Sequence, residues 1–281
     1  MHLGIFSYNT DYGIRADALA KALEERGYES LWVGEHTHIP ASRETPYPGG
    51  GELPKPYYHM ADPFVSLAAA AAVTSRIKLG TGICLVVERD PITLAKEVAT
   101  LDRIADGRFL FGVGGGWNAE EMENHGTPFK RRWRVLRERI EAMRAIWTEE
   151  EASYAGEFVR FERIISHPKP VRKPHPPVIL GSATAKGRQR VVDYCEGWIP
   201  IDVLLEDLPA ALEDLERRAE AAGRDAAGIS VSVFAFDGAD PDALKRYREI
   251  GIDRVVLISP RREADALRFA DRFAELIPAL A

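Results

Sequence analysis

Residues 77–117 read IKLGTGICLVVERDPITLAKEVATLDRIADGRFLFGVGGGW and contain one complete strand–helix–strand unit. The apolar run 77–86 predicts a strand buried on both faces, and residues 94–105 repeat apolar side chains at helical spacing. A second apolar run, 109–113, follows and ends in consecutive glycines. Two strands joined by a crossover helix are the building unit of a parallel sheet. This stretch therefore predicts an α/β fold.

The same alternation extends from this unit toward both ends of the chain. Six more strands are predicted, at 3–8, 30–33, 178–180, 197–200, 229–236 and 254–258. Helices are predicted between and after them, at 15–26, 63–74, 131–147, 186–194, 206–222, 241–250 and 263–279. Residues 154–162 alternate around Gly156, which predicts a small hairpin inserted after the fourth strand–helix unit.

Eight consecutive strand–helix units favour a ring over an open sheet. A (β/α)8 TIM barrel typically needs ~250 residues, and this chain has 281. We therefore expect one TIM-barrel domain over residues 1–281. An open doubly wound sheet remains the alternative, because periodicity does not show whether the last strand pairs with the first.

The composition excludes several classes of function. With 46% hydrophobic and 28% charged residues and a net charge of -6, the chain resembles a globular protein with no broad electrostatic attraction to nucleic acid or anionic membrane. No apolar stretch approaches the ~18 residues of a membrane span. Cys84 and Cys195 are too few for a disulfide framework or a zinc pattern. We expect a reduced, cytoplasmic protein without a metal, in which Cys84 is a small buried hydrophobic residue.

Two glycine-containing loops follow predicted strands and together suggest a phosphate clamp. Glycines let backbone amides approach an anion closely, and a helix N-terminus adds free donors. On one rim of a barrel the two loops lie close together. Each loop alone also fits an ordinary turn, and Ser182 fits a helix N-cap. The residues concerned are Gly114, Gly115, Gly116 and Trp117 in the first loop and Gly181, Ser182 and Ala183 in the second.

An acid and an imidazole, Glu35 and His36, follow the predicted strand 30–33. A histidine titrates near neutrality and suits proton transfer, and an adjacent carboxylate can orient it. A structural histidine bonded to backbone fits the spacing equally well, and Glu35 is alternatively a buried partner for an arginine from the following helices. Residues that follow barrel strands line the catalytic face, which favours His36 as the catalytic proton donor or acceptor and Glu35 as its orienting partner.

Several longer segments, in order along residues 3–202, resemble the bacterial luciferase-like monooxygenase family, and most of all its branch of deazaflavin-dependent oxidoreductases that use coenzyme F420. These segments are LWVGEH (31–36), TSRIKLGTG (74–82), AKEVATLD (95–102), DGRF (106–109) continuing through GGGW (114–117), PPVILG (176–181) and GW (197–198).

The resemblance implies a barrel with the cofactor ring across the strand ends. It implies a non-proline cis peptide at Gly82–Ile83 beneath the ring, and phosphate binding by the two glycine-containing loops. In related deazaflavin-dependent dehydrogenases a histidine at the position of His36 is the base. Those enzymes also carry a glutamate where this chain has Gly115, so a sugar-phosphate dehydrogenase with that pair is not supported.

The expected activity is hydride exchange between coenzyme F420 and a small organic substrate. Asn9, which follows the first strand, is a candidate polar contact to the ring or the substrate. The alternatives are an FMN-dependent monooxygenase that activates oxygen and a flavin-binding protein without turnover. The family analogy also implies a homodimer. The Pro- and Gly-rich loop 39–58 is predicted to cover the mouth of the barrel.

Overall fold

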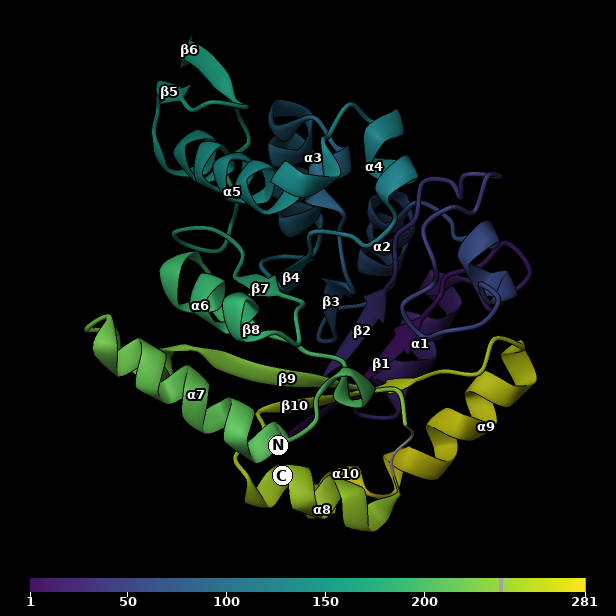
Figure 1. Cartoon of the computed structure of the whole chain (residues 1–281). Helices are drawn as coiled ribbons and strands as arrows, with labels where there is room; N and C mark the ends of the chain where they lie inside the picture. The colour runs from purple at the N-terminus through teal and green to yellow at the C-terminus, as the bar shows by residue number, and fades with distance from the viewer. Residues whose placement is uncertain (238–239, 281) are drawn as a thin grey trace.

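Eight parallel strands close into a barrel in the computed structural model, which describes residues 1–237 and 240–280 (Figure 1). The strands of the barrel are β1 (His2–Ser7), β2 (Ser30–Val33), β3 (Lys78–Thr81), β4 (Phe109–Val113), β7 (Val178–Leu180), β8 (Gly197–Trp198), β9 (Ser230–Ala235) and β10 (Arg254–Ile258). β1 pairs with β2 on one side and with β10 on the other, so that Ile5 aligns with both Leu31 and Leu257. This closure confirms the TIM barrel and excludes the open sheet.

Helices cover the outside of the barrel. The longer ones are α1 (Ala16–Glu25), α2 (Pro63–Ala72), α3 (Pro91–Ile104), α5 (Arg132–Thr148), α6 (Ala185–Tyr194), α7 (Leu208–Ala221), α8 (Pro241–Glu249) and α9 (Glu263–Ala274). The short elements are α4 (Ala119–Asn124), α10 (Ile277–Leu280) and the 3-10 helices η1 (Lys55–His59), η2 (Val86–Glu88), η3 (Phe129–Arg131), η4 (Asp202–Leu204) and η5 (Ala226–Gly228). None of the described helices is long and apolar enough to cross a membrane.

Asp–Pro pairs fix where α2, α3 and α8 begin. Asp62, Asp90 and Asp240 each accept a hydrogen bond from the backbone amide three residues further on. The proline that follows each aspartate has no amide hydrogen to leave unpaired in the first turn. The sequence therefore sets the start of each helix at the residue after the aspartate.

The predicted hairpin is present between α5 and β7. Its strands β5 (Ala152–Ala155) and β6 (Arg160–Ile164) pair antiparallel and project from the barrel beside α5 (Figure 1). Glu138 of α5 accepts hydrogen bonds from the amides of Phe158 (2.7 Å) and Val159 (3.3 Å) in the hairpin turn. This carboxylate ties the insertion to the barrel.

Two predicted elements end more than two residues from where the structure ends them. The apolar run 77–86 is not one strand: β3 ends at Thr81, and the chain continues through a one-residue bridge at Cys84 and the turn η2. An apolar run reports burial, and burial alone does not distinguish a strand from another buried segment. The predicted helix 263–279 is interrupted after Ala274. In a continuous helix Pro278 would lack the amide hydrogen that bonds to the carbonyl of Ala274, and its ring would clash with that carbonyl.

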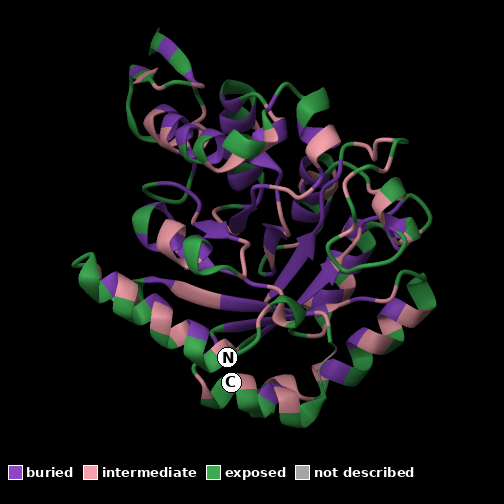
Figure 2. Ribbon diagram, in the orientation of Figure 1, coloured by how far each residue is buried: buried purple, intermediate pink, exposed green. Residues whose placement is uncertain are grey.

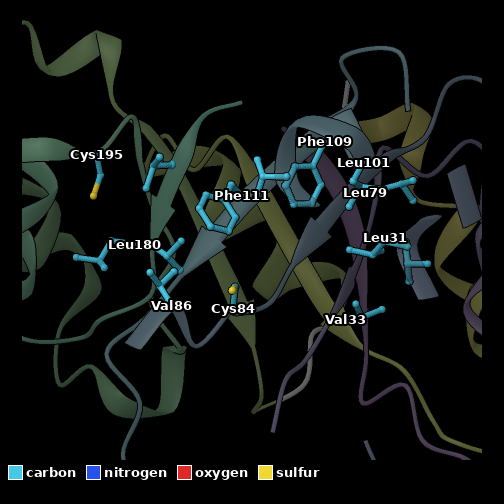
Figure 3. Close-up of a cluster of buried hydrophobic side chains, with 14 of the residues drawn as sticks. Leu31, Val33, Leu79, Cys84, Val86, Leu101, Phe109, Phe111, Leu180 and Cys195 are labelled. Carbon is cyan, nitrogen blue, oxygen red and sulfur yellow. The ribbon is translucent and has the colours of Figure 1, made fainter. Parts of the chain in front are cut away.

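The apolar core has two layers. The inner layer fills the barrel with Phe6, Trp32, Leu110, Ile179, Ile199, Phe234 and Val256. The outer layer lies between the strands and the inner faces of the helices, so the strands are buried while the outer helix faces are exposed (Figure 2). Cys84 lies in this outer layer with Phe111 and Val86 (Figure 3), which confirms it as a buried hydrophobic residue, and burial raises the pKa of its thiol.

Candidate functional site

The two glycine-containing loops meet at the strand ends, around the side chain of Ile83. The amide of Gly181 donates to the carbonyl of Val113 (2.9 Å), which joins the loop after β7 to the end of β4. A Cβ at Gly114 would lie 1.7 Å from Cδ1 of Ile83, so any other residue there requires the Ile83 side chain to move. The Gly82–Ile83 peptide is cis, as the resemblance implies. The structure thus brings the ends of β3, β4 and β7 together as one surface.

The loop after β7 presents its polar groups at the start of α6. Thr184, and not Ser182, caps the helix, since Oγ1 of Thr184 accepts from the amide of Gly187 (3.0 Å). Oγ of Ser182 lies 3.3 Å from Oγ1 of Thr184, and its carbonyl accepts from Nε1 of Trp198 (2.7 Å). Ser182 and Ala183 therefore stand beside a helix N-terminus, where free amides and the helix dipole favour an anion.

Two arginines without a carboxylate partner lie beside this clamp. The guanidinium of Arg190 is 4.2 Å from the ring centroid of Trp133, and that of Arg132 is 5.6 Å from it. Burial, and for Arg132 also the charge of Arg190, lowers the pKa of each guanidinium. Across residues 1–237 and 240–280 neither forms an ion pair, whereas Arg188 binds Asp214 at 2.7 Å. The more distant Asp193 acts on Arg190, but no carboxylate of the described residues contacts either guanidinium.

Trp133 explains why position 115 is glycine. A Cβ at Gly115 would lie 3.0 Å from the indole ring, which is closer than side chains normally approach. A glutamate at this position, as in the related dehydrogenases, is therefore incompatible with the present place of Trp133. The adjacent Gly116 has a φ of 65°, a left-handed conformation that favours glycine.

His36 is buried at the mouth of the barrel against a glutamate that the sequence did not single out. Nδ1 of His36 lies 2.7 Å from Oε2 of Glu121 on α4, and both side chains are almost fully buried. A carboxylate only accepts hydrogen bonds, so the contact places a proton on Nδ1 and leaves Nε2 to exchange a proton with a ligand. The imidazole ring packs against Tyr57 (5.4 Å) and Trp117 (5.6 Å).

The prediction that Glu35 orients His36 is wrong. Oε2 of Glu35 accepts from the amide of Leu85 (2.6 Å), and Oε1 accepts from Nε of Arg89 (2.7 Å). Arg89 also binds Asp62 (2.6 Å), so these groups lock the segment after β3 onto the start of α2. Adjacent residues of an extended segment point to opposite sides, which turns Glu35 away from His36. The alternative of a buried arginine partner is confirmed.

A second buried carboxyl, Glu88, faces the Glu121 side chain. Burial, together with the charges of Glu121 and Glu35, raises the pKa of Glu88 to about 9. No hydrogen bond within the described chain satisfies either oxygen of Glu88 or Oε1 of Glu121. Behind His36 there is thus a pair of carboxyl groups in a setting that disfavours two negative charges.

Aromatic side chains of the loop after β2 reach the rim. Tyr47 lies 5.9 Å and Tyr57 6.4 Å, between ring centroids, from Trp117 of the glycine loop. The amide of Thr45 donates to Oε1 of Glu120 at 2.7 Å, which ties the loop to α4. We call Tyr47, Tyr57 and Trp117 the aromatic cluster; burial raises the pKa of the Tyr57 hydroxyl. These contacts place the loop over His36.

Asn9 has a φ of 52° and uses its amide nitrogen structurally. Nδ2 donates to the carbonyl of Ala61 (3.2 Å) and to Oγ of Ser66 (2.9 Å). The side chain therefore fixes the start of α2 against β1. Its carbonyl oxygen is the group left to contact a ligand, so its predicted role stays a prediction.

Six residues of this site were not predicted from the sequence. Some of them follow a pattern that could have identified them, and others do not. Glu121 follows the glycine loop, and Glu88 follows the third strand. The rule that residues after barrel strands line the functional face (the strand-end rule) therefore finds both, if it is extended by one turn of helix. The unpaired state of an arginine has no signal in the sequence, because it depends on where every carboxylate lies. The missed residues are Glu88, Glu121, Tyr47, Tyr57, Arg132 and Arg190.

Comparison with known proteins gives a consistent result. The model of the luciferase-like monooxygenase family matches residues 7–273. An uncharacterised protein of Mycobacterium tuberculosis is 44% identical over 98% of each chain. The F420-dependent glucose-6-phosphate dehydrogenase of Segniliparus rotundus is 30% identical over 79% of this chain and 63% of its own.

The monooxygenase RslO1 from Streptomyces bottropensis shares the fold, with a TM-score of 0.79 over 100% of both chains at 23% identity. The family includes F420-dependent and FMN-dependent oxidoreductases. The match over nearly the whole chain, together with the closed barrel, shows that this chain belongs to the luciferase-like monooxygenase family.

Proposed function

We propose that this chain is an F420-dependent oxidoreductase that exchanges hydride with a small organic substrate. The observation that carries the proposal is His36, buried at the strand ends and held through Nδ1 by Glu121, beside the glycine clamp. The bound deazaflavin supplies the hydride chemistry, and the protein supplies position and proton transfer. The membership in a family with F420-dependent enzymes supports the same reading.

The residues of the rim fit such a cofactor. The missing side chains of Gly114 and Gly181 leave room for the Ile83 side chain, which packs against both glycines at the strand ends and offers a planar ring an apolar surface. The phosphate belongs at Ser182 and the start of α6. Nε of Arg132 is buried without a partner within the described residues, and an anion at the clamp would satisfy it.

In this reaction His36 exchanges a proton at Nε2 with the substrate, while Glu121 holds the ring through Nδ1. Tyr57 and Trp117 pack on the imidazole and limit the access of water to it. Exclusion of water strengthens the electrostatic interaction between the imidazole and a polar substrate group. This arrangement argues against a protein that only stores the cofactor.

The second candidate is an FMN-dependent monooxygenase. The barrel rim and the glycine clamp suit FMN equally, and the family includes FMN-dependent members. We favour F420 because the two arginines give more positive charge than one terminal phosphate needs, and F420 carries further carboxylates beyond its phosphodiester. Cofactor identity decides the reaction class, since a deazaflavin is a poor activator of oxygen.

A titration of the purified protein with F420 and, separately, with FMN tests the proposal. Quenching of tryptophan fluorescence by the ring reports binding near Trp117. We expect F420 to bind at least about tenfold more tightly, and Arg190→Gln to weaken F420 more than FMN. The matched control is Arg217→Gln, an exposed arginine on α7. Tighter binding of FMN would transfer the proposal to the monooxygenase, and binding of neither would overturn both.

We also propose that the protein is a homodimer through α2 and α3. Val65 on α2, Val73 directly after it, and Ile92 and Ile104 on α3 are large apolar side chains that are at least 40% exposed. Exposed apolar groups on adjacent helices favour association. Sedimentation analysis is expected to give twice the chain mass of 31.2 kDa, and Val65→Arg to lower it toward the monomer. A monomeric parent protein would rule the dimer out.

A further inference from the structure

The Glu88 carboxyl has no role in holding His36, yet it interacts with Glu121, the carboxylate that does. Its side chain is 1% exposed and ends the turn η2 after β3. Carboxyl groups that face one another in a dry environment retain a proton between them, because two adjacent negative charges are strongly unfavourable. Since Glu121 contacts Nδ1 of His36, a proton on the carboxyl pair stands next to the imidazole.

Glu88 also lines a cavity of 350 Å³ that is separate from the mouth of the barrel. The walls of this cavity come from the start of α3, from Arg139 on α5 and from the hairpin residues Phe158 and Phe161. No member of the aromatic cluster, and not His36, is among its lining residues in the described chain. The cavity therefore offers solvent a second approach to the carboxyl pair.

His125 stands between Glu88 and solvent. Nε2 of His125 lies 4.0 Å from Oε2 of Glu88, and the imidazole is 29% exposed and lines the same cavity. The same nitrogen is 2.8 Å from Oγ1 of Thr37. Proton transfer between His125 and Glu88 requires this imidazole nitrogen to turn from Thr37 toward the carboxyl, a tightening of the kind that resting active sites undergo.

We propose, building on the function proposed above, that Glu121, Glu88 and His125 form a proton relay that connects Nδ1 of His36 with solvent through this cavity. Nδ1 of His36 lies 2.7 Å from Glu121, and Nε2 of His125 lies 4.0 Å from Glu88. Between them, the charge of Glu121 acts on the Glu88 carboxyl and raises its pKa. Glu88 and His125 act through His36 and touch no substrate. The relay lets the site exchange protons while the aromatic cluster keeps the mouth closed to water.

The proton balance of the relay is simple. When Nε2 of His36 takes a proton from a substrate hydroxyl, Nδ1 passes its own proton to Glu121. The carboxyl pair then holds two protons, and it releases one through His125 to water in the cavity. Reduction of a carbonyl substrate runs the same steps backward, and no electrons move along the relay.

The surroundings of Glu88 raise its pKa to about 9, so this carboxyl keeps its proton at neutral pH. The groups that face it are Glu35 after β2, Glu121 on α4, His125 after α4 and Arg139 on α5, with Arg89 adjacent. Burial and the neighbouring carboxylates outweigh Arg89 and raise the pKa of Glu88. Burial and the nearby His38 lower the pKa of His125, so this imidazole is neutral and able to accept a proton.

The test uses the whole protein without cofactor, labelled with 15N in its 7 histidines. The measured quantity is the rate at which the Nδ1 proton of His36 exchanges with water. We expect Glu88→Gln and His125→Phe each to slow this exchange about tenfold or more, because the relay is the faster route. Glu123→Gln, an exposed carboxylate on the same helix as Glu121, should keep the parent rate. An unchanged rate in either Glu88→Gln or His125→Phe would overturn the relay.

A second readout is the chemical shift of the His36 ring as a function of pH. In the parent we expect a step near pH 9, when Glu88 loses its proton, and no such step in Glu88→Gln. A parent without the step would disprove the shared proton. Neither measurement involves F420, so the relay can fail while F420 binds, and the proposed function can fail while the relay operates.

Discussion

Replacing Glu88 by glutamine should stabilise the fold, and by more at higher pH. The folded protein keeps the Glu88 proton up to about pH 9, whereas the ordinary value is 4.5. Between these values the folded state binds more protons than the unfolded state, so the free energy of unfolding of the parent falls as pH rises. The contribution of the protonated carboxyl is complete below about 4.5 and is lost as pH passes about 9.

The size of the effect follows from the same shift. Each pH unit in this window is worth about 1.4 kcal/mol, so the advantage of Glu88→Gln should grow by about 3 kcal/mol between pH 5 and pH 7. Glutamine has the shape of the protonated acid and nothing to ionise. Solvent screening is weak, because the Glu88 side chain is 1% exposed.

Urea unfolding at pH 5, 6, 7 and 8 measures this difference, with Glu123→Gln as the exposed control. For a chain of this size about 3 kcal/mol corresponds to about 5 °C in Tm. The free-energy gap between Glu88→Gln and the parent should widen steadily with pH, while the control stays parallel to the parent. A gap of equal size at pH 5 and pH 7 would refute the buried, protonated state of Glu88.

The other predictions concern the site itself. His36→Asn should lower the rate of hydride transfer by about 10²- to 10⁴-fold and leave the Kd for F420 within about twofold, as stopped-flow and titration will show; a normal rate would remove the acid–base role. Arg190→Gln should weaken F420 about tenfold, or ~1.4 kcal/mol, and reduce the salt dependence of the Kd; an unaltered salt dependence would separate this arginine from the cofactor. Gly115→Glu should lower the free energy of unfolding by about 1–3 kcal/mol, because its Cβ meets Trp133; a stability equal to the parent would mean that Trp133 moves freely.

Most of the barrel could be predicted because its strands are buried on both faces and stand between amphipathic helices. β2, β4, β7 and β10 begin and end where the apolar runs predict. The exceptions have local causes. β3 stops at Thr81 inside a longer apolar run, and α9 stops at Ala274, before Pro278. The burial and periodicity of a sequence indicate which layer of the fold a segment belongs to. They do not show where the backbone interrupts a strand or a helix.

The site was predictable only as far as the strand-end rule reaches. That rule placed His36, Gly114 and Gly181 on one rim, since the carboxyl ends of parallel strands meet there. It failed for the partner of His36, because Glu35 is adjacent in sequence and Glu121 is 85 positions away. Contacts between side chains depend on tertiary packing, and neighbours in an extended segment face apart.

The measurement that tests the central claim most directly is a crystal structure of the protein with F420 bound. We expect the deazaflavin ring over the Gly82–Ile83 peptide beside His36, with its phosphate within hydrogen-bonding distance of Ser182 and its tail toward Arg190. A ring or phosphate bound elsewhere, for instance in the cavity lined by Asp202 and Tyr247, would contradict it.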